Sequence, residues 1–250
     1  MPSPLSASRL KAIASYRLQK NLDADNLFIV EGVRLCAEAL ASGFHVHTIC
    51  ALPDWLAANA AHIPANATVY EITPEQLDRL SLQRTPNKVW MLLERRKPQT
   101  IVDNSQLVLA LDRLQDPGNF GTILRTADWF GIRNVVCSPD TVSCYNPKVV
   151  QATMGAIFRT NISYCNLPEW LSGAKKQGFH IYGALLDGDN LYHADIKKPA
   201  MLIIGNEGRG ISPEVAAIVQ HKLTIPNLGG TCESLNAATA TAIIISELTK

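Results

Sequence analysis

The sequence predicts an α/β protein whose C-terminal part is a mostly parallel sheet with helices on both faces. Short apolar runs of strand length alternate with segments whose apolar residues recur at the 3.6-residue period of a helix. Strands separated by helices form parallel sheets that are covered on both faces. The 250 residues are 47% hydrophobic, which allows a sizeable core in one large domain or two of ordinary size.

The N-terminal part has the pattern of a small α/β module. A helix beginning at Thr73-Pro74-Glu75 is indicated because proline is favoured at the first helical position. The other expected elements are a basic helix at residues 8–20, a helix at 33–41, and strands at 27–30, 46–50 and 89–93. Charge, Pro98 and polar residues mark a boundary at residues 95–106. We therefore expect two domains, residues 1–98 and 106–250.

Strands and helices continue to alternate after this boundary. Asn146-Pro147 and Ser212-Pro213 mark two helix starts, because an N-capping residue precedes a proline in both. The expected strands span residues 107–112, 133–138, 160–165, 179–186, 201–204 and 222–225. The expected helices span residues 120–130, 147–158, 169–177, 213–220 and 235–248. This order of elements predicts the parallel sheet.

The overall charge gives little indication of a polyanionic partner. The formal net charge is +1, which argues against avid non-specific binding to nucleic acid. Four basic residues nevertheless lie in the first twenty residues with no acidic residue among them: Arg9, Lys11, Arg17 and Lys20. Arg95-Arg96-Lys97 form a second basic cluster. Most clusters of this kind are solvated surface, so they become informative only together with other evidence.

The cysteines, histidines and apolar runs exclude several classes of protein. Six cysteines form no CxxC pair and no zinc-ligand spacing with the six histidines: Cys36, Cys50, Cys137, Cys144, Cys165 and Cys232. With no signal peptide, we interpret them as reduced thiols and expect a cytoplasmic protein. The apolar stretches fall short of the roughly 20 residues that a membrane span needs. We expect neither a membrane nor a metal ion as a partner.

The most informative segment is LDRLQDPGNFGTILRTADWFG, residues 111–131. Residues 116–119 have the composition of a turn, and Asn119 is a favoured N-cap for the following helix. One buried face is predicted from residues at positions i, i+3, i+4 and i+7: Phe120, Ile123, Leu124 and Ala127. Arg125 lies off this face. Taken alone, the segment favours a solvated Arg125 that pairs with Asp128.

Two glycine-rich loops complete the set of motifs. Residues 201–212, MLIIGNEGRGIS, are an apolar strand that enters a turn. Residues 223–248, LTIPNLGGTCESLNAATATAIIISEL, are a strand, a loop and a helix of small residues. The spacing of the first loop imitates a phosphate-binding P-loop, but Ile211 stands where that motif needs lysine, which excludes a nucleoside triphosphatase. Ser234 and Asn236 are favoured N-caps for the last helix.

The three segments, in this order, resemble the SpoU family of the SPOUT superfamily, S-adenosylmethionine-dependent RNA 2′-O-ribose methyltransferases. The resemblance covers most of residues 107–248, and FIVEGVRLCAEAL at residues 28–40 is loosely similar to that family's substrate-binding domain. It implies a C-terminal trefoil knot and a preceding L30e-like α/β domain. It also implies a homodimer that acts on structured rRNA or tRNA.

The resemblance also implies roles for individual residues. The family's site residues correspond here to Asn119, Arg125, Glu207, Ser234 and Asn236. The residues that would enclose S-adenosylmethionine, largely through backbone atoms, are Gly205, Asn206, Gly210, Ile225 and Leu235. The departures from the family pattern are mild. Residues 237–242 carry alanine and threonine where Val-Ser-Val-type residues are common, and Lys88 replaces a glycine.

The implied reaction is methyl transfer from a sulfonium to a ribose 2′-hydroxyl, which is a poor nucleophile while it keeps its proton. Because a guanidinium is essentially always protonated, we expect Arg125 to be a fixed cation rather than a base. It would stabilise the forming alkoxide and grip a phosphate. Asn119 would hold Arg125 or the ribose. The N-terminal module would grip the RNA through phosphate contacts.

Two alternatives stay open at this point. A non-catalytic RNA-binding or ribosome-assembly protein can keep the same fold, although such decay usually removes the polar site residues first. A SPOUT enzyme that methylates a base nitrogen is the other alternative, although base methylation calls for a carboxylate or similar group to take the ring proton. The sequence does not identify the RNA or the nucleotide.

Overall fold

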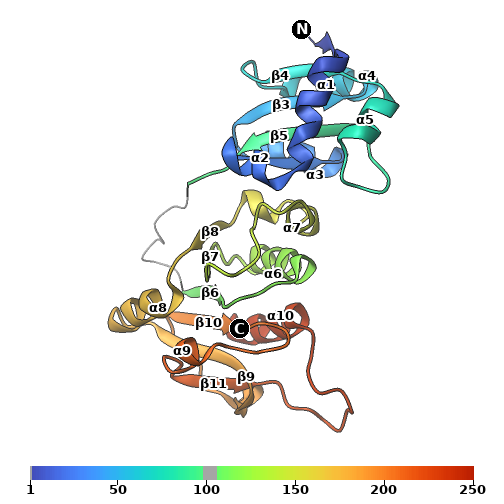
Figure 1. Ribbon diagram of the computed structural model, residues 1–250. Helices are drawn as coiled ribbons and strands as arrows, with labels where there is room; N and C mark the ends of the chain where they lie inside the picture. The colour runs from blue at the N-terminus through green and yellow to red at the C-terminus, as the bar shows by residue number, and fades with distance from the viewer. Residues whose placement is uncertain (1, 98–105) are drawn as a thin grey trace. The chain divides into compact units, whose positions relative to one another are not determined.

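The structure, a computed structural model, describes residues 2–97 and 106–250 (Figure 1). The described residues divide into two compact units. Unit 1 contains residues up to 97 together with 145–158, and unit 2 contains residues 106–144 together with 159–250. Of the boundary predicted at residues 95–106, positions 98–105 lie outside the described residues. The predicted α/β class is confirmed.

Unit 1 is built on a mixed sheet with the strand order β1-β4-β3-β5-β2. Its strands are β1 (Ser3–Pro4), β2 (Leu27–Glu31), β3 (Val46–Ala51), β4 (Thr68–Glu71) and β5 (Val89–Glu94). Strand β5 runs antiparallel to β2 and β3, and the other neighbouring strands are parallel. All of β2 and all but the last residue of β5 are buried, which explains why both runs are almost continuously apolar.

The helices of unit 1 differ from the prediction in the basic segment near the N-terminus. Those that precede residue 98 are α1 (Ala7–Ala14), α2 (Gln19–Ala24), α3 (Val33–Ala41), α4 (Pro53–Asn59) and α5 (Pro74–Leu80), with 3-10 turns at Ser15–Arg17 and Ala60–His62. The basic segment predicted as one helix at residues 8–20 is divided, because the backbone of Leu18 is extended (φ −91°, ψ 121°). The sequence pattern gives no clear indication of the short elements α4, β1 and β4.

Residues 145–158, which follow the first strands of unit 2 in sequence, belong to unit 1. They form helix α7 (Pro147–Ala152) and a 3-10 turn (Ala156–Phe158). The single helix predicted at residues 147–158 is interrupted because Met154 and Gly155 have positive φ angles of 50° and 97°. The start at Asn146-Pro147 is confirmed, since the Asn146 side chain accepts the N–H of Lys148.

Aromatic rings join this late segment to the core of unit 1. The Tyr145 ring lies 4.7 Å from the Phe28 ring, and Phe158 meets Phe44 edge-on, with 5.3 Å between ring centroids. Aromatic pairs at these separations add to the stabilisation from area burial. Unit 1 therefore depends on apolar surface that its first 97 residues do not supply.

Two members of the predicted basic cluster are part of the same packing. The Arg95 guanidinium lies over the Tyr145 ring at 5.5 Å, and the Arg96 guanidinium lies over the Phe44 ring at 3.8 Å. Both also donate to backbone oxygens, Arg95 to Leu27 and Arg96 to Ser42 (both 2.9 Å). Arg95 and Arg96 therefore contribute to the packing of unit 1, and the basic cluster is not simply a solvated surface.

Unit 2 contains a sheet with the order β11-β9-β10-β6-β7-β8, in which all neighbouring strands are parallel. Its strands are β6 (Leu107–Leu111), β7 (Asn134–Cys137), β8 (Asn161–Tyr164), β9 (His180–Asn190), β10 (Ala200–Ile204) and β11 (His221–Thr224). The predicted parallel sheet is confirmed. The central strands β6 and β10 are buried throughout, as expected for strands covered on both faces.

Helices cover both faces of this sheet (Figure 1). Helices α6 (Pro117–Trp129) and α10 (Ala237–Leu248) pack together on one face, and α8 (Leu167–Lys176) and α9 (Pro213–Ala216) lie on the other. After β6 the chain continues to β7 and β8 on one side, whereas after β10 it continues to β11 on the other. The winding direction therefore reverses between β6 and β10, and open α/β sheets bind ligands at the strand carboxyl ends beside such a point.

We predict that Phe158→Ala destabilises unit 1 even though Phe158 lies far from the rest of that unit in sequence. Phe158 is buried, so its truncation leaves a cavity beside Phe44 and should cost about 3 kcal/mol or more of unfolding free energy. Denaturant unfolding measures the loss, and hydrogen exchange of the β2 and β3 amides locates it. Leu18→Ala, at a side chain that is 55% exposed, is the control and should cost less than about 0.5 kcal/mol. Equal effects of the two substitutions would contradict the contribution of residues 145–158 to the core.

Candidate active site

Two loops at the carboxyl ends of unit 2 strands carry predicted site residues, and a third leads into helix α6, which carries Asn119 and Arg125. Residues 112–116 follow β6, residues 205–212 follow β10 and residues 225–236 follow β11. The carboxyl ends of parallel strands lie at one edge of a sheet. The fold therefore brings together three segments that are far apart in the sequence.

The helix that carries Asn119 and Arg125 begins earlier than predicted. Helix α6 starts at Pro117, and its N-cap is Asp116, whose Oδ1 accepts the backbone N–H of Asn119 at 2.6 Å. The prediction of Asn119 as the N-cap is therefore wrong. Pro117 supplies the reason, because a residue without an N–H fits the first helical position and places the cap one residue before it. The Asn119 side chain is left available for contacts outside its own helix.

A chain of hydrogen bonds joins Asn236, Asn119 and Glu207. Asn236 is the N-cap of α10, and its Oδ1 accepts the backbone N–H groups of Ala238 and Thr239 at 2.9 and 3.3 Å. Its Nδ2 donates to Oδ1 of Asn119 at 2.8 Å. Nδ2 of Asn119 in turn donates to Oε1 of Glu207 at 3.1 Å. The Asn236 side chain thus both caps α10 and belongs to the candidate site.

The helix cap fixes the direction of this chain. Because the oxygen of Asn236 faces the helix N–H groups, its amide nitrogen must face Asn119, and the amide of Asn119 must then present its nitrogen to Glu207. The same Glu207 oxygen also accepts the backbone N–H of Asp116 at 3.4 Å. Linked hydrogen bonds polarise one another, and those that end on a carboxylate are stronger than neutral ones. Three loops are therefore held in one arrangement.

Arg125 and Ser234 stand apart from this chain. Arg125 is exposed on α6, and in residues 2–97 and 106–250 it has no hydrogen bond or ion pair, whether with Asn119 or with Asp128. Asp128 instead pairs with Arg133 and Arg159, with N–O distances of 2.5 and 2.9 Å. Ser234 is exposed in the loop before α10. The Arg125 guanidinium therefore remains accessible to a ligand, and the backbone of Arg125 lies about 9 Å along the helix axis from that of Asn119.

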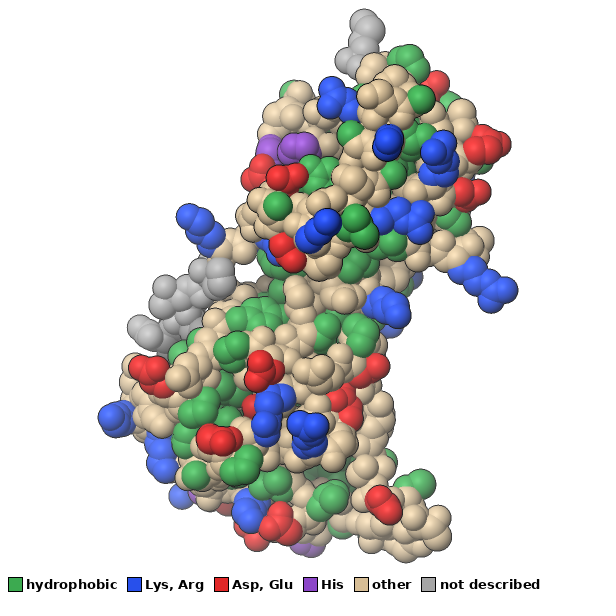
Figure 2. All heavy atoms as spheres, in the orientation of Figure 1, with side chains coloured by type: hydrophobic (Ala, Val, Ile, Leu, Met, Phe, Trp, Pro, Cys, Tyr) green, Lys and Arg blue, Asp and Glu red, His purple; other side chains and the backbone are tan. Residues whose placement is uncertain are grey.

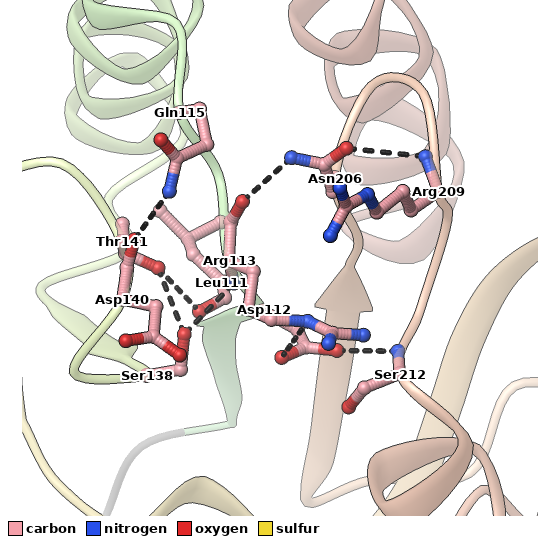
Figure 3. Close-up of polar contacts among 10 residues, drawn as sticks. All are labelled: Leu111, Asp112, Arg113, Gln115, Ser138, Asp140, Thr141, Asn206, Arg209 and Ser212. Carbon is pink, nitrogen blue, oxygen red and sulfur yellow. Dashed lines mark hydrogen bonds and ion pairs between the residues drawn. The ribbon is translucent and has the colours of Figure 1, made fainter.

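Residues 205–210 form a tight hairpin that presents Glu207. Asn206 and Gly210 exchange backbone hydrogen bonds of 3.0 and 2.9 Å. The Asn206 side chain accepts the N–H groups of Gly208 and Arg209 and donates to the carbonyl oxygen of Arg113 at 2.8 Å (Figure 3). The polar groups of the Asn206 side chain are thus used in hydrogen bonds that shape the loop. Any effect of Asn206 on a cofactor must therefore come from the conformation of the loop.

Gly205 lies where the hairpin comes closest to the end of β10. A Cβ at this position would lie 2.3 Å from the carbonyl carbon of Gly210 and 2.4 Å from the nitrogen of Ile211. The space beside Gly205 is therefore filled by the loop itself rather than left open for a ligand. Of the other predicted cofactor residues, Ile225 follows β11 and is partly buried, whereas Leu235 precedes α10 and is 49% exposed.

Asp112 is a site residue that sequence reasoning missed. It is buried directly after β6, and its Oδ2 accepts the backbone N–H of Ser212 at 2.6 Å. This bond ties the end of β6 to the loop that follows β10, as Figure 3 shows. Its Oδ1 lies 3.8 Å from Nε of Arg113. The signal in the sequence was an acidic residue immediately after an apolar strand.

The cysteines lie mostly inside the fold, and only Cys232 is exposed. The six cysteines are free thiols, and burial raises the pKa of the Cys50 thiol to about 12. Within the part of the chain that the structure describes, no group of three or more His, Cys, Asp or Glu side chains could hold a metal ion. No helix among the same residues has the length and apolarity to cross a bilayer.

Comparisons with known proteins match both parts of the chain. The model of the SpoU rRNA methylase family matches residues 106–246, and that of the MRM3-like substrate binding domain matches residues 7–90. The chain is 30% identical to the 23S rRNA (guanosine(2553)-2′-O)-methyltransferase RlmP of Bacillus subtilis. That similarity covers 92% of this chain and 91% of the relative.

Solved structures have the same fold over almost their whole length. A protein assigned to the TrmH family of RNA methyltransferases, from Porphyromonas gingivalis, is 40% identical, with a TM-score of 0.88 and 98% of each chain covered. An rRNA methyltransferase from Sinorhizobium meliloti with bound AdoMet is 29% identical, with a TM-score of 0.88. There the similarity covers 99% of this chain and 96% of the other.

Gly205→Ala is predicted to disrupt the hairpin that presents Glu207. The added methyl group meets backbone atoms, which cannot yield as a flexible side chain does, so unfolding free energy should fall by about 2 kcal/mol or more. Gly173→Ala is the matched control, because a Cβ at that position in α8 meets nothing within 4 Å. It should instead stabilise the helix by roughly 0.5–1 kcal/mol. Thermal unfolding compares the two, and a harmless Gly205→Ala would contradict the tight approach.

Proposed function

The chain belongs to the SpoU rRNA methylase family, and from this membership we propose that it transfers a methyl group from S-adenosylmethionine to a ribose 2′-hydroxyl of ribosomal RNA. The observation that carries the proposal is the hydrogen-bonded chain Asn236–Asn119–Glu207. It joins the three motifs that correspond to the family's site. An accessible Arg125 lies on the same helix as Asn119.

The residues around the β11–α10 loop fit S-adenosylmethionine. Leu228 is 94% exposed and Leu235 is 49% exposed, so apolar surface is available to the adenosine part of the cofactor. Gly205, Asn206 and Gly210 shape the facing hairpin. We propose that these two loops enclose the cofactor and that the chain after β11 is threaded as the family's trefoil knot. The S. meliloti protein with bound AdoMet supports the choice of cofactor.

The proposed mechanism relies on orientation and charge. S-Adenosylmethionine, when bound, supplies an electrophilic methyl group on its sulfonium. Asn119 and Asn236 each keep one amide N–H that has no partner among the described residues, and these can donate to ribose oxygens. Arg125 stabilises the negative charge that develops on the 2′ oxygen. Because a guanidinium does not take up a proton, another group must accept the proton of the 2′-hydroxyl. We assign this role to Glu207, the carboxylate of the site.

Two other functions for the same fold are weaker. A non-catalytic RNA-binding protein has no need for side-chain amides whose orientation is fixed by a helix cap, as it is for Asn236 and Asn119. A methylase of a base nitrogen would use a carboxylate to remove the ring proton; Glu207 suits that role as well as it suits the ribose reaction, so it is the relatives that decide. The names of the relatives, which specify 2′-O-methylation, favour ribose.

We propose that residues 1–98 bind RNA and that residues 106–250 carry the reaction. The family match of residues 7–90 supports this division, and an L30e-like fold for the first domain remains part of the proposal. The basic residues of the first helical segment are exposed: Arg9, Lys11, Arg17 and Lys20. Figure 2 shows Lys and Arg side chains interspersed with acidic ones, so contacts to RNA shape should outweigh bulk charge.

Arg125→Ala tests the proposed function. It should nearly abolish methyl transfer to a 23S rRNA transcript, whereas stability and S-adenosylmethionine affinity should stay close to wild type because the side chain is exposed. Arg125→Lys should also be poor, since a point charge cannot replace a planar fork. Transfer of labelled methyl and alkaline digestion detect the product, because a 2′-O-methyl group blocks cleavage at its linkage. Full activity of Arg125→Ala, or wild-type cofactor binding that EDTA abolishes, would contradict the mechanism.

A homodimer formed through unit 2 is also proposed. Trp129 is 86% exposed at the end of α6, and an indole is rarely left so exposed on a monomer surface. Light scattering coupled to size exclusion should give about twice the chain mass of 27.3 kDa. Trp129→Glu should shift this mass toward the monomer, because it places a charge in an apolar contact. A wild-type monomer with full activity would contradict the proposal.

A further inference from the structure

An open cleft lies between the loops that follow β6 and β10. Its volume is about 530 Å³, and it is lined by Arg113, Gln115, Asp140, Asn206 and Arg209. The cleft stands where the winding direction of the sheet reverses. It also borders the candidate active site, because Gln115 precedes the α6 cap Asp116 and Asn206 precedes Glu207.

Hydrogen bonds hold the walls of the cleft in place (Figure 3). The backbone N–H of Arg113 donates to Oγ of Ser138 at 2.8 Å, and its carbonyl oxygen accepts from Asn206 at the same distance. Gln115 closes the other side by donating to the carbonyl oxygen of Asp140 at 2.7 Å. The cleft is therefore preformed rather than dependent on a ligand for its shape.

Arg113 adopts a backbone conformation that favours glycine. Its φ is 57°, which costs an L-residue about 1 kcal/mol or more. Among the described residues its Nε has no hydrogen-bond partner, but it lies 3.8 Å from Oδ1 of the buried Asp112, and the side chain as a whole is 33% exposed. A strained backbone that places a cation in a cleft indicates a binding role in addition to the contact with Asp112.

A second guanidinium lines the same cleft. Arg209 is exposed, has no ion pair in the described part of the chain, and points into the space between Asn206 and Arg113 in Figure 3. Guanidinium forks match the paired oxygens of a phosphate. Arg113 is already paired with the Asp112 carboxylate (Nε–Oδ1 3.8 Å), so Arg209 supplies the charge that a singly charged phosphodiester would neutralise.

We infer that this cleft binds a backbone phosphate of the RNA next to the ribose held at Glu207, through Arg113 and Arg209. The inference rests on the proposed function, because it takes RNA as the substrate. The carboxylate of S-adenosylmethionine has the same oxyanion chemistry. The phosphate fits better because a cofactor enclosed by both proposed loops would touch both, whereas the cleft is lined by Asn206 and Arg209 of the hairpin and by nothing from residues 225–236.

The experiment compares full-length Arg113→Gly, Arg209→Ala and the control Lys176→Ala, which removes an exposed charge on α8. Glycine suits the φ of Arg113, which offsets the loss of the contact between its Nε and Asp112, so the first variant should stay folded, as thermal unfolding checks. Binding to a 23S rRNA transcript and to polyuridylate is measured over a range of salt concentrations. Each cleft variant should bind roughly tenfold more weakly. Its plot of log affinity against log salt should be shallower by about one.

S-Adenosylmethionine affinity, measured by calorimetry, should stay unchanged in all three variants. Salt slopes of both cleft variants equal to that of Lys176→Ala would overturn the inference. Lost cofactor affinity with intact RNA binding would also overturn it and assign the cleft to the cofactor carboxylate. The proposed function would be contradicted if the wild-type protein transferred no methyl group. If the salt slopes of both cleft variants were nevertheless shallower than that of wild type, the phosphate site would still be supported.

Discussion

The N-terminal cap of α10 is the constraint on which the site depends. Asn236 has one amide group, and its oxygen must satisfy helix N–H groups that otherwise have no partner. Its nitrogen is thereby turned toward Asn119, whose nitrogen is turned toward Glu207. A local requirement of one helix thus orients three side chains from three separate segments of the chain. A site that is oriented before substrate arrives needs little reorganisation during the reaction.

The ends of β6 and β10 supply the support for that arrangement. Buried Asp112 joins them through the N–H of Ser212, and its own N–H donates to the carbonyl oxygen of Ile204 at 2.8 Å. The hairpin then closes on Gly205, so that Glu207 projects from a loop with little freedom to move. Removing either partner would leave a buried carboxylate or backbone group without a hydrogen bond, which is costly. The positions of the loops are therefore fixed by the strands that precede them.

The parallel sheet and the helix starts at Pro147 and Pro213 were predictable because they follow from local patterns of period and capping. The site was predictable only as a set of residues. The bond between Asn236 and Asn119 spans 117 positions, and neither side chain signals the other in the sequence. The cap of α6 was misassigned because Asp116 and Asn119 are both good N-caps, and only the position of Pro117 decides between them. The pairing of Tyr145 with Phe28 is likewise a long-range contact without a local pattern.

The placement of residues 145–158 in unit 1 has a consequence for synthesis on the ribosome. When residue 97 has emerged, the rings of Phe28 and Phe44 still lack their partners Tyr145 and Phe158. The missing stretch takes roughly 3–12 seconds to translate at ordinary elongation rates. During that interval β6, α6 and β7 are also made. The nascent chain must therefore keep one incomplete apolar core from aggregating while a second begins to form, and a chaperone that binds aromatic segments would act within this window.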